Sequence, residues 1–508
     1  MRAGVIAKTA CRSCRLVYKK IGGSINLQAL SEVFSGLEGV SILGGNEAES
    51  TANRFSYWAS EPLEIFEFKA GEEKPFEKLE HALAKYKLED GNSNEISEGI
   101  FCGGWVGYFS YELGRYIEKL PETMVDDLQM PLIRLGFYDR VICYDHEEKE
   151  FRLIVLELEG DSESAEEKIS GLERLLEDAG NINMPLPVKG NLDDIEFSQI
   201  KSNMERGYYL DAIEKIRHYI YDGQVYQVNF SQRFECDYDA NSIKLYHWQN
   251  YYNASSYAAY IDGGDFQIVS ASPEMFVTVN KRQISTKPIK GTRRRVSDEG
   301  DGAKTNAKNF QDLSSSEKEQ AELNMIVDLE RNDLARICRA GTRKVVQKRT
   351  IESYPTVFHA VATVAGELAA GVGFCDILKA MFPGGSITGA PKVSSMEIID
   401  ELEPSQRGVY TGSIGFIGVD GNAGLNIAIR TIIIKGRKAY AQAGGGIVID
   451  SKAEAEWDET LTKARALLAG IKVVNSEVEN LKRKVQRVQQ IAHPTSGIKA
   501  VQEKYING

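Results

Sequence analysis

The sequence predicts a large globular protein that combines α-helices with β-strands. Its 508 residues are 42% hydrophobic and 26% charged, with a mean hydropathy of -0.31, which is typical of soluble globular chains rather than disordered or membrane-spanning ones. Strand-like apolar runs at 266–271, 431–436 and 439–450 alternate with segments of helical spacing such as 204–224. At roughly 150 residues per domain, the chain has room for about three domains or for one large core.

The charge balance argues against a nucleic-acid partner, as the composition argues against a membrane one. The 61 Lys and Arg residues are outnumbered by 73 Asp and Glu, giving a net charge of -12 at pH 7, whereas a nucleic-acid binder needs a basic surface. The seven cysteines have no disulfide or zinc spacing beyond the pair Cys11 and Cys14. Free thiols persist in a reducing compartment, so we expect a cytoplasmic protein.

The elements of the N-terminal part follow in chain order. The run RLVYKKI at 15–21 alternates like a strand, which favours a first strand. No apolar segment follows the early basic residues, which argues against a secretory leader, and an organellar leader is the alternative that stays open. Paired glycines and aromatic residues at 101–116 indicate a core strand. A helix is expected over 165–180, inside the acidic and proline-containing stretch 160–196 that is the best candidate boundary.

This boundary and the start of a charged tail at 473 divide the chain into three expected regions. They are an N-terminal region at 1–195, a catalytic region at 196–472 and an appended charged helical tail at 473–508. The catalytic region begins with the helical pattern of 204–224, for which Gly223 is a plausible stop.

Acidic side chains gather on a predicted C-terminal helix at 452–471. Glu456, Glu459 and Lys463 are three and four residues apart and therefore share one helix face. The simplest interpretation is a solvated, salt-bridged face. Carboxylate pairs are also how proteins hold Mg2+, which keeps several of its waters, so a metal site is the alternative.

Another helix is expected over 314–341, with serines at the N-cap and a stop at Gly341. Its Glu322 faces either solvent or a cleft. The segment 382–402 is a glycine-rich loop that leads into a helix, and its free amides could bind an anion. It lacks the Gly-Lys-Ser/Thr register of a nucleotide-binding loop, so a carboxylate ligand fits as well as a phosphate.

The remaining candidate site residues are a run of glycines and a pair formed by an acid and an amine. The glycines at 444–446 follow a strand, where they mark either a bulge or the close approach of a ligand. Glu274 and Lys290 lie on adjoining strand-like segments, which would face one pocket if these form a hairpin. A nucleophilic lysine needs a lowered pKa, which burial and the nearby cations of 293–295 would supply. The alternative is a basic surface patch.

Together these motifs resemble the chorismate-utilising enzymes, the family of anthranilate synthase component I, aminodeoxychorismate synthase component I and the isochorismate synthases. The motifs that carry the resemblance are GGWVGYFSYE (103–112), GQVYQVNFSQRF (223–234), SPE (272–274), PIKGTR (288–293), AELNMIVDLERNDL (321–334), GGSITGAPK (384–392), TGSIGFIG (411–418), AIRT (428–431), GGGIVIDS (444–451) and EAEWDETLTKA (454–464). The resemblance implies an α+β fold with two large antiparallel β-sheets packed as a sandwich and helices outside.

The resemblance also implies roles for single residues. Glu322 and Glu459 match the family's Mg2+ ligands, Glu456 matches the supporting carboxylate, and the metal would hold the ring carboxylate of chorismate. Other residues match groups around the substrate, namely Arg430, Tyr410, Lys463, Gly444, Gly445 and Gly446 near the enolpyruvyl carboxylate, Ser386 in the glycine-rich loop and His359 near the ring. Glu274 corresponds to the general acid/base that protonates the departing 4-hydroxyl.

Two positions decide the branch of the family. Members that add water carry a lysine at the position of Gln227, so glutamine resembles the ammonia-using branch. Anthranilate synthases typically carry alanine at the position of Lys290, whereas PIKGT resembles aminodeoxychorismate synthase. The implied reaction is attack of Lys290 on C2 of chorismate, loss of the 4-hydroxyl with help from Glu274, and displacement of the lysine by ammonia at C4.

The implied product is 4-amino-4-deoxychorismate, in 4-aminobenzoate and folate biosynthesis. The chain has no Gly-x-Cys-x-Gly glutaminase motif, so ammonia is expected from a separate glutamine amidotransferase subunit (component II). One alternative is anthranilate synthase component I of tryptophan biosynthesis. An alternative of another class is a non-catalytic chorismate-binding subunit, which would be expected to lack Glu322, Glu459, Glu274 or His359.

Overall fold

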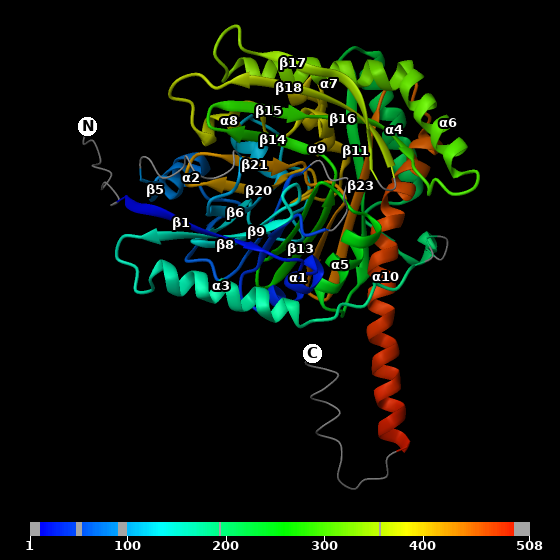
Figure 1. Ribbon diagram of the computed structural model, residues 1–508. Coiled ribbons are helices and arrows are strands. Elements are labelled where there is room, and N and C mark those ends of the chain that lie inside the picture. Colours follow the sequence, from blue (N-terminus) through cyan, green and yellow to red (C-terminus); the bar gives the residue numbers. More distant parts are fainter. Residues whose placement is uncertain are drawn as a thin grey trace.

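The computed structural model describes residues 11–46, 53–89, 99–190, 192, 195–354 and 357–491. Among these residues the strands form one 13-stranded sheet and one 10-stranded sheet, with helices on the outside (Figure 1). The predicted α+β class with two large sheets is confirmed. One detail differs from the prediction, because β1 and β5 at the edge of the larger sheet pair in parallel.

The larger sheet runs in the order β10-β11-β23-β22-β13-β12-β2-β3-β8-β9-β1-β5, with β19 paired to β11. Its strands are β1 (Arg12–Gly22), β2 (Ser41–Leu43), β3 (Phe55–Ala59), β5 (Tyr86–Leu88), β8 (Arg140–Asp145), β9 (Glu150–Leu158), β10 (Lys201–Ser202), β11 (Gln227–Asp237), β12 (Tyr257–Asp262), β13 (Phe266–Ser272), β19 (Gly389–Ala390), β22 (Thr431–Lys435) and β23 (Lys438–Ile447).

The smaller sheet runs in the order β16-β18-β15-β14-β21-β20-β6-β7-β4, with β17 paired to β18. Its strands are β4 (Glu64–Phe68), β6 (Gly104–Phe109), β7 (Ile133–Tyr138), β14 (Met275–Asn280), β15 (Gln283–Lys287), β16 (Ile289–Arg294), β17 (Lys344–Ser353), β18 (Val357–Glu367), β20 (Ser413–Gly418) and β21 (Ala423–Asn426).

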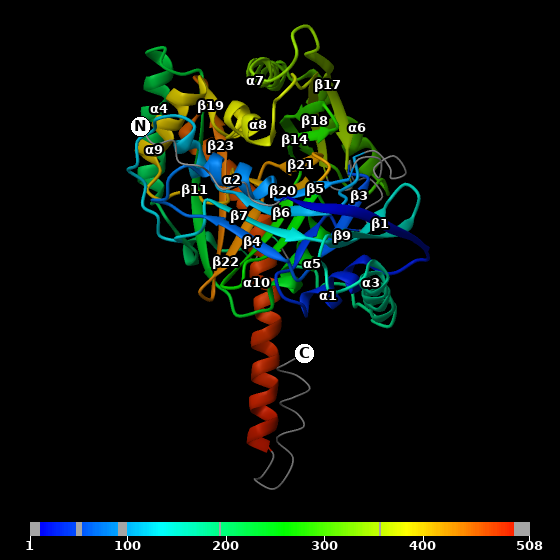
Figure 2. The same cartoon turned by 90° about the vertical axis from the view of Figure 1, so that its left-hand side faces the viewer.

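Helices cover the two sheets and one of them projects away from the body (Figure 2). The α-helices are α1 (Leu27–Ser35), α2 (Pro75–Leu83), α3 (Ala165–Gly180), α4 (Arg206–Tyr221), α5 (Ser242–Tyr252), α6 (Gly302–Ser315), α7 (Glu317–Ala335), α8 (Phe374–Met381), α9 (Lys392–Leu402) and α10 (Ala453–Ile491). Short 3-10 helices are η1 (Tyr111–Tyr116), η3 (Phe197–Gln199) and η4 (Gly385–Ile387). None of the described helices has the length and apolar character required to cross a membrane.

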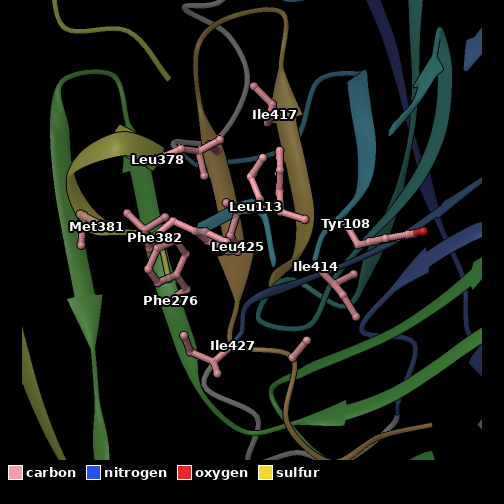
Figure 3. Packing of buried hydrophobic residues seen from close by; sticks show 14 of the residues in the cluster. Tyr108, Leu113, Phe276, Leu378, Met381, Phe382, Ile414, Ile417, Leu425 and Ile427 are labelled. Atoms are coloured by element: carbon pink, nitrogen blue, oxygen red, sulfur yellow. The ribbon is translucent and has the colours of Figure 1, made fainter. Parts of the chain in front are cut away.

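The largest core cluster lies between the two sheets and continues under α8. Figure 3 shows part of it, where Leu425 and Ile427 from β21 and its following loop lie near Phe276 of β14 and Phe382 at the end of α8. A second cluster fills the opposite face of the larger sheet, where α1, α3, α5 and α10 pack. Burial of apolar side chains on both faces makes the larger sheet the central layer.

Each sheet combines strands from before and after the predicted boundary at 195. Strand β2 pairs with β12, so that Ile42 lies opposite Tyr260. Strand β6 pairs with β20 from Phe109 to Gly104 along the whole length of the strand. The expected division at 195/196 stays a prediction, although neither sheet is confined to one side of it.

Several predicted elements are present with small changes in their ends. The first strand, the helix at 165–180 and the strands at 266–271, 431–436 and 439–450 are all found. The helix predicted over 314–341 ends earlier, at Ala335, because Arg336 caps it and the following chain turns toward β17. The C-terminal helix α10 runs without a break across the predicted tail boundary at 472/473, and 492–508 lie outside the described residues.

Candidate active site

The predicted site residues come from elements that meet at one end of the two sheets. The glycine run of β23 pairs with the start of β11, where Gly446 lies opposite Asn229. The short strand β19, which belongs to the glycine-rich loop, pairs with the other side of β11. Helix α10 packs on β23, while α7 packs on β16 and β18. The two acidic helices therefore approach the same region from opposite sides.

The predicted acid and amine meet through a hairpin of β14 and β15. Met275 lies opposite Lys287 in this hairpin, so the residues just outside the pair, Glu274 and 288–290, are brought together at its open end. The Ile289 amide donates a hydrogen bond of 3.4 Å to Oε1 of Glu274. The amine of Lys290 in turn donates a hydrogen bond of 3.2 Å to the carbonyl oxygen of Ser386.

Burial shifts the pKa values of Glu274 and Lys290 in the directions that favour their uncharged forms. Glu274 is 4% exposed, and burial raises its pKa despite a hydrogen bond from the Ser386 side chain and the positive charge of Lys290. Burial likewise lowers the pKa of Lys290, although Glu274 and Glu322 oppose the shift and Lys463 supports it. Burial thus shifts both groups toward their uncharged forms.

The contacts of the neighbouring arginines fit the alternative interpretation of a basic surface patch. The guanidinium of Arg293 pairs with Glu319 at 2.7 Å and that of Arg295 with Asp298 at 3.2 Å. Arg294 is exposed on β16. Alternate residues of a strand point to opposite faces, so sequence proximity did not place these charges in the pocket. The cation that acts on Lys290 is instead Lys463 from α10.

His359 of β18 is a buried, neutral imidazole. Its Nδ1 lies 2.9 Å from Oγ1 of Thr292, and the rings of His359 and Tyr354 are 5.4 Å apart. Burial, followed by the positive charge of Arg430, lowers its pKa to about 3. His359 and Arg430 also line a cavity of about 10 Å³ together with 253–256, which is close to the size of one water molecule.

Acid should therefore destabilise the protein through His359. Because the folded pKa lies below the unfolded value, only the unfolded chain gains a proton as the pH falls below about 6.5. Between pH 7 and pH 5, we expect the wild type to lose about 2 kcal/mol more unfolding free energy than His359→Gln. Urea unfolding at both pH values measures the difference, and equal losses in the two proteins would contradict a neutral His359.

Polar side chains pack closely against the glycines at 444–446, in space that a side chain at these positions would occupy. A Cβ atom at Gly446 would stand 1.9 Å from Nε2 of Gln227, and one at Gly445 would stand 3.1 Å from Oε2 of Glu456. Gln227 is 1% exposed, and its Oε1 has no hydrogen-bond partner in the described part of the chain. The carbonyl of Gly444 accepts a hydrogen bond of 2.8 Å from Lys463.

The three predicted metal ligands lie on both sides of this region. On α10, Glu459 pairs with Lys463 at 2.7 Å and Glu456 accepts a hydrogen bond of 2.6 Å from Ser451. On α7, burial raises the pKa of Glu322, and Glu459 contributes to the shift. Within the described residues no three acidic, histidine or cysteine side chains are gathered closely enough to hold a metal ion.

Oxygen donors on facing helices still suit Mg2+. This ion needs only one or two carboxylates, since water and substrate oxygens complete its shell. Two of these donor oxygens lie close to Gly445, since Oε2 of Glu456 and Oε1 of Glu459 stand 3.1 Å and 3.7 Å from the position of a Cβ atom there. The donor set therefore fits the ion chemically.

Arg430 and Tyr410 are two of the predicted carboxylate-binding residues, of which Arg430 is partly exposed and Tyr410 is buried. The guanidinium of Arg430 has no hydrogen bond or ion pair to any residue described by the structure, and burial lowers its pKa. Arg430 also has a positive φ of 51°, which is uncommon for a residue other than glycine. Tyr410 is 5% exposed, and its ring lies 6.0 Å from the guanidinium carbon of Arg407.

Some contacts of the site were not foreseen from the sequence. Ser386 was expected to contact substrate, and its carbonyl oxygen also accepts a hydrogen bond from the Lys290 amine. Thr292 holds His359, and Glu330 of α7 contacts the loop before Ser386. No sequence pattern predicts these contacts, because the two residues of each contact lie on different elements far apart in the sequence.

Comparisons with known proteins agree with this arrangement. The family model described as chorismate binding enzyme matches residues 47–469. Aminodeoxychorismate synthase component 1 of Bacillus subtilis (strain 168) is 39% identical over 393 residues, which cover 77% of this chain and 81% of the relative. Anthranilate synthase component 1 of Pseudomonas aeruginosa is also 39% identical, over 387 residues that cover 75% of this chain and 77% of the relative.

Solved structures share the fold. Anthranilate synthase component I from Streptococcus pneumoniae TIGR4 matches with a TM-score of 0.68 at 31% identity, covering 82% of this chain and 93% of that chain. MenF, the menaquinone-specific isochorismate synthase from Escherichia coli, matches with a TM-score of 0.65 at 15% identity, covering 91% of this chain and 95% of that chain. The second likeness concerns the fold alone.

Proposed function

Because this chain belongs to the family of chorismate binding enzymes, we propose that it is the chorismate-converting component of an aminodeoxychorismate synthase. It would convert chorismate and ammonia to 4-amino-4-deoxychorismate through a covalent lysine adduct. The observation that carries the proposal is the proximity of Glu274 and Lys290, each of which acts on the pKa of the other while burial shifts both toward a neutral acid and a neutral amine.

This protonation state is the one that the reaction needs. The lone pair of Lys290 forms a bond to C2, the two ring double bonds shift by one position, and the C4–O bond breaks. Glu274 gives its proton to the departing hydroxyl, which leaves as water. Ammonia then forms a bond to C4, the double bonds shift back, and the lysine leaves C2 with its electron pair. Glu274 takes up the proton released by the attached ammonia. An uncharged lysine is required for the first step.

The environment of Gln227 supports ammonia rather than water as the second reactant. A neutral carboxamide cannot act as the base that activates water. Its Oε1 is a buried acceptor with no hydrogen-bond partner among the described residues, and ammonia has hydrogens to donate. The Nε2 side of the same amide faces the glycine run at Gly446.

The second candidate is anthranilate synthase component I, whose relative in Pseudomonas aeruginosa is as similar as the first. The residue at 290 favours the first candidate, since the Lys290 amine donates a hydrogen bond to the Ser386 carbonyl and lies close enough to Glu274 for that carboxyl group to act on its pKa. Anthranilate formation has no use for a nucleophilic amine at this position.

Mg2+ belongs to the proposal as well. Glu322, Glu456 and Glu459 would hold it, and the bound ion would neutralise a substrate carboxylate. We expect that Glu459→Gln weakens Mg2+ binding by a factor of about ten or more, as calorimetry would measure, because one of few charged ligands is lost. The matched control is Glu454→Gln, an exposed residue five positions earlier on α10, and equal affinities in both variants would contradict this assignment.

Product analysis tests the proposed function. The purified chain is incubated with chorismate, Mg2+ and ammonium at mildly alkaline pH, and the products are separated by chromatography. We expect 4-amino-4-deoxychorismate with its enolpyruvyl group retained. Anthranilate as the main product would replace the first candidate by the second, and no turnover at all would favour a non-catalytic chorismate-binding subunit. A glutamine amidotransferase subunit, the proposed physiological ammonia source, should lower the ammonium requirement.

A further inference from the structure

A buried acidic side chain lies behind the lysine site. Glu330 is two helical turns beyond Glu322 on α7 and is 3% exposed. Its Oε1 accepts a hydrogen bond of 3.3 Å from the Gly385 amide, whereas its Oε2 is buried and has no hydrogen-bond partner in the described part of the chain. A buried oxygen without a partner is destabilising, so a carboxyl group at this position calls for an explanation.

The residue after the amide that Glu330 contacts is hydrogen-bonded to Lys290. Ser386 follows Gly385, and its carbonyl oxygen accepts the hydrogen bond from Lys290. The side chain of Ser386 also hydrogen-bonds Glu274. The loop lies tightly on α7, because a Cβ atom at Gly385 would stand 2.5 Å from Cδ2 of Leu329 and 3.2 Å from Oε1 of Glu330.

We propose that Glu330 is a positioning residue for the lysine: by holding the Gly385 amide, it fixes the carbonyl of Ser386 that aims the Lys290 amine. The inference rests on the proposed role of Lys290 as nucleophile. Glu330 touches neither substrate nor the reacting atoms, so its effect passes through the loop of η4.

The Glu330 carboxyl group acts as a neutral acceptor. Burial, followed by the charge of Asp333, raises its pKa to about 8, against the opposing effects of Lys392 and the Gly385 amide. Lys392 is already paired with Asp333 at 2.6 Å and donates to the carbonyl of Met381. Glutamine has the shape and the carbonyl acceptor of a neutral glutamic acid, and it is therefore the conservative replacement.

Two replacements of Glu330 test the effect of its hydrogen-bond acceptor separately from the effect of its volume. Glu330→Gln keeps an acceptor for the Gly385 amide, and Glu330→Leu removes it while filling much of the same volume. Gly385→Ala disturbs the same contact from the loop side and serves if the leucine variant does not fold. Asp328→Asn is the matched control, since Asp328 lies on the exposed side of α7 in an ion pair with Arg331.

The first measurement is steady-state turnover of chorismate with ammonium. We expect Glu330→Leu and Gly385→Ala to lower kcat by about 10- to 100-fold, because small misplacements of a reacting group have effects of this size, with KM for chorismate nearly unchanged. Glu330→Gln and Asp328→Asn should stay within about threefold of the wild type.

The second measurement does not depend on turnover. Lys290 is labelled with trace acetic anhydride across a range of pH, and mass spectrometry gives the midpoint of its reactivity. The charged groups that act on Lys290 are Glu274, Glu322, Lys463 and Glu459, and all four are retained. Loss of the Ser386 acceptor should lower the midpoint by about half a pH unit in Glu330→Leu, with no shift in Glu330→Gln.

Several results would overturn the inference. These are a wild-type kcat in Glu330→Leu and Gly385→Ala, an unchanged labelling midpoint in both, or a kcat in Glu330→Gln as low as in Glu330→Leu. If Lys290 itself proved dispensable for turnover, the proposed mechanism would fail. The labelling midpoint would still report whether Glu330 holds the loop, so the two failures can be told apart.

Discussion

Replacing Lys290 with alanine is expected to lower formation of 4-amino-4-deoxychorismate by about a thousandfold or more, as is usual when a nucleophile is removed. The amine lies near Glu274 and donates a hydrogen bond to the Ser386 carbonyl, and alanine offers no nucleophile in its place. Alanine also recreates the residue typical of the anthranilate branch, and we expect part of the remaining flux to yield anthranilate, detected by its fluorescence.

The control for this variant is Arg294→Ala, because Arg294 is exposed on the same strand and should retain wild-type rates. Acid quenching during turnover, followed by mass spectrometry of the peptide that contains Lys290, should reveal the adduct in the wild type alone. Normal turnover of the alanine variant, without any detectable adduct, would disprove covalent catalysis.

Replacing Arg407 with methionine is expected to cost about 3 to 5 kcal/mol of unfolding free energy, the usual effect of leaving one partner of a buried ion pair unpaired. The Arg407 side chain is fully buried and pairs with Glu403 at 2.6 Å. Its remaining donors reach the carbonyls of Ile387 and Asn229 and the hydroxyl of Thr411. All of its hydrogen-bonding capacity is thus satisfied inside the core.

Urea unfolding followed by circular dichroism measures this loss. The double variant Arg407→Met/Glu403→Gln should recover at least about 1 kcal/mol, because it removes the unpaired charge while an acceptor remains for the Ser231 amide. Arg331→Met disrupts an exposed pair with Asp328 and should cost less than about 0.5 kcal/mol. A cost below about 1 kcal/mol for the single Arg407 variant would show that the pair contributes little.

The sequence was informative where function depends on local spacing. Glu456, Glu459 and Lys463 were placed on one helix face from their spacing, and Lys463 does pair with Glu459. The hairpin that joins Glu274 to Lys290 was also anticipated from two adjoining strand-like segments. Helix and strand periodicities are properties of short windows, so a single sequence carries them.

The sequence was uninformative where a contact joins distant segments. Periodicity could not order strands such as β6 beside β20, and the fold came instead from the family resemblance. The buried Glu330 looks in the sequence like one more charge in an acidic helix, because only the approach of Gly385 reveals its burial. The expected roles of the site residues remain predictions that the experiments above would test.

The interleaving of early and late strands also has a consequence for synthesis of the chain. Strand β6 emerges from the ribosome long before its partner β20, and Gly104 finally pairs with Gly418. At about 5 to 20 residues per second, the edge of β6 waits roughly 15 to 60 s for that partner. An unpaired apolar edge invites pairing with other chains. We therefore expect the nascent N-terminal half to be prone to aggregation until β20 has been synthesised.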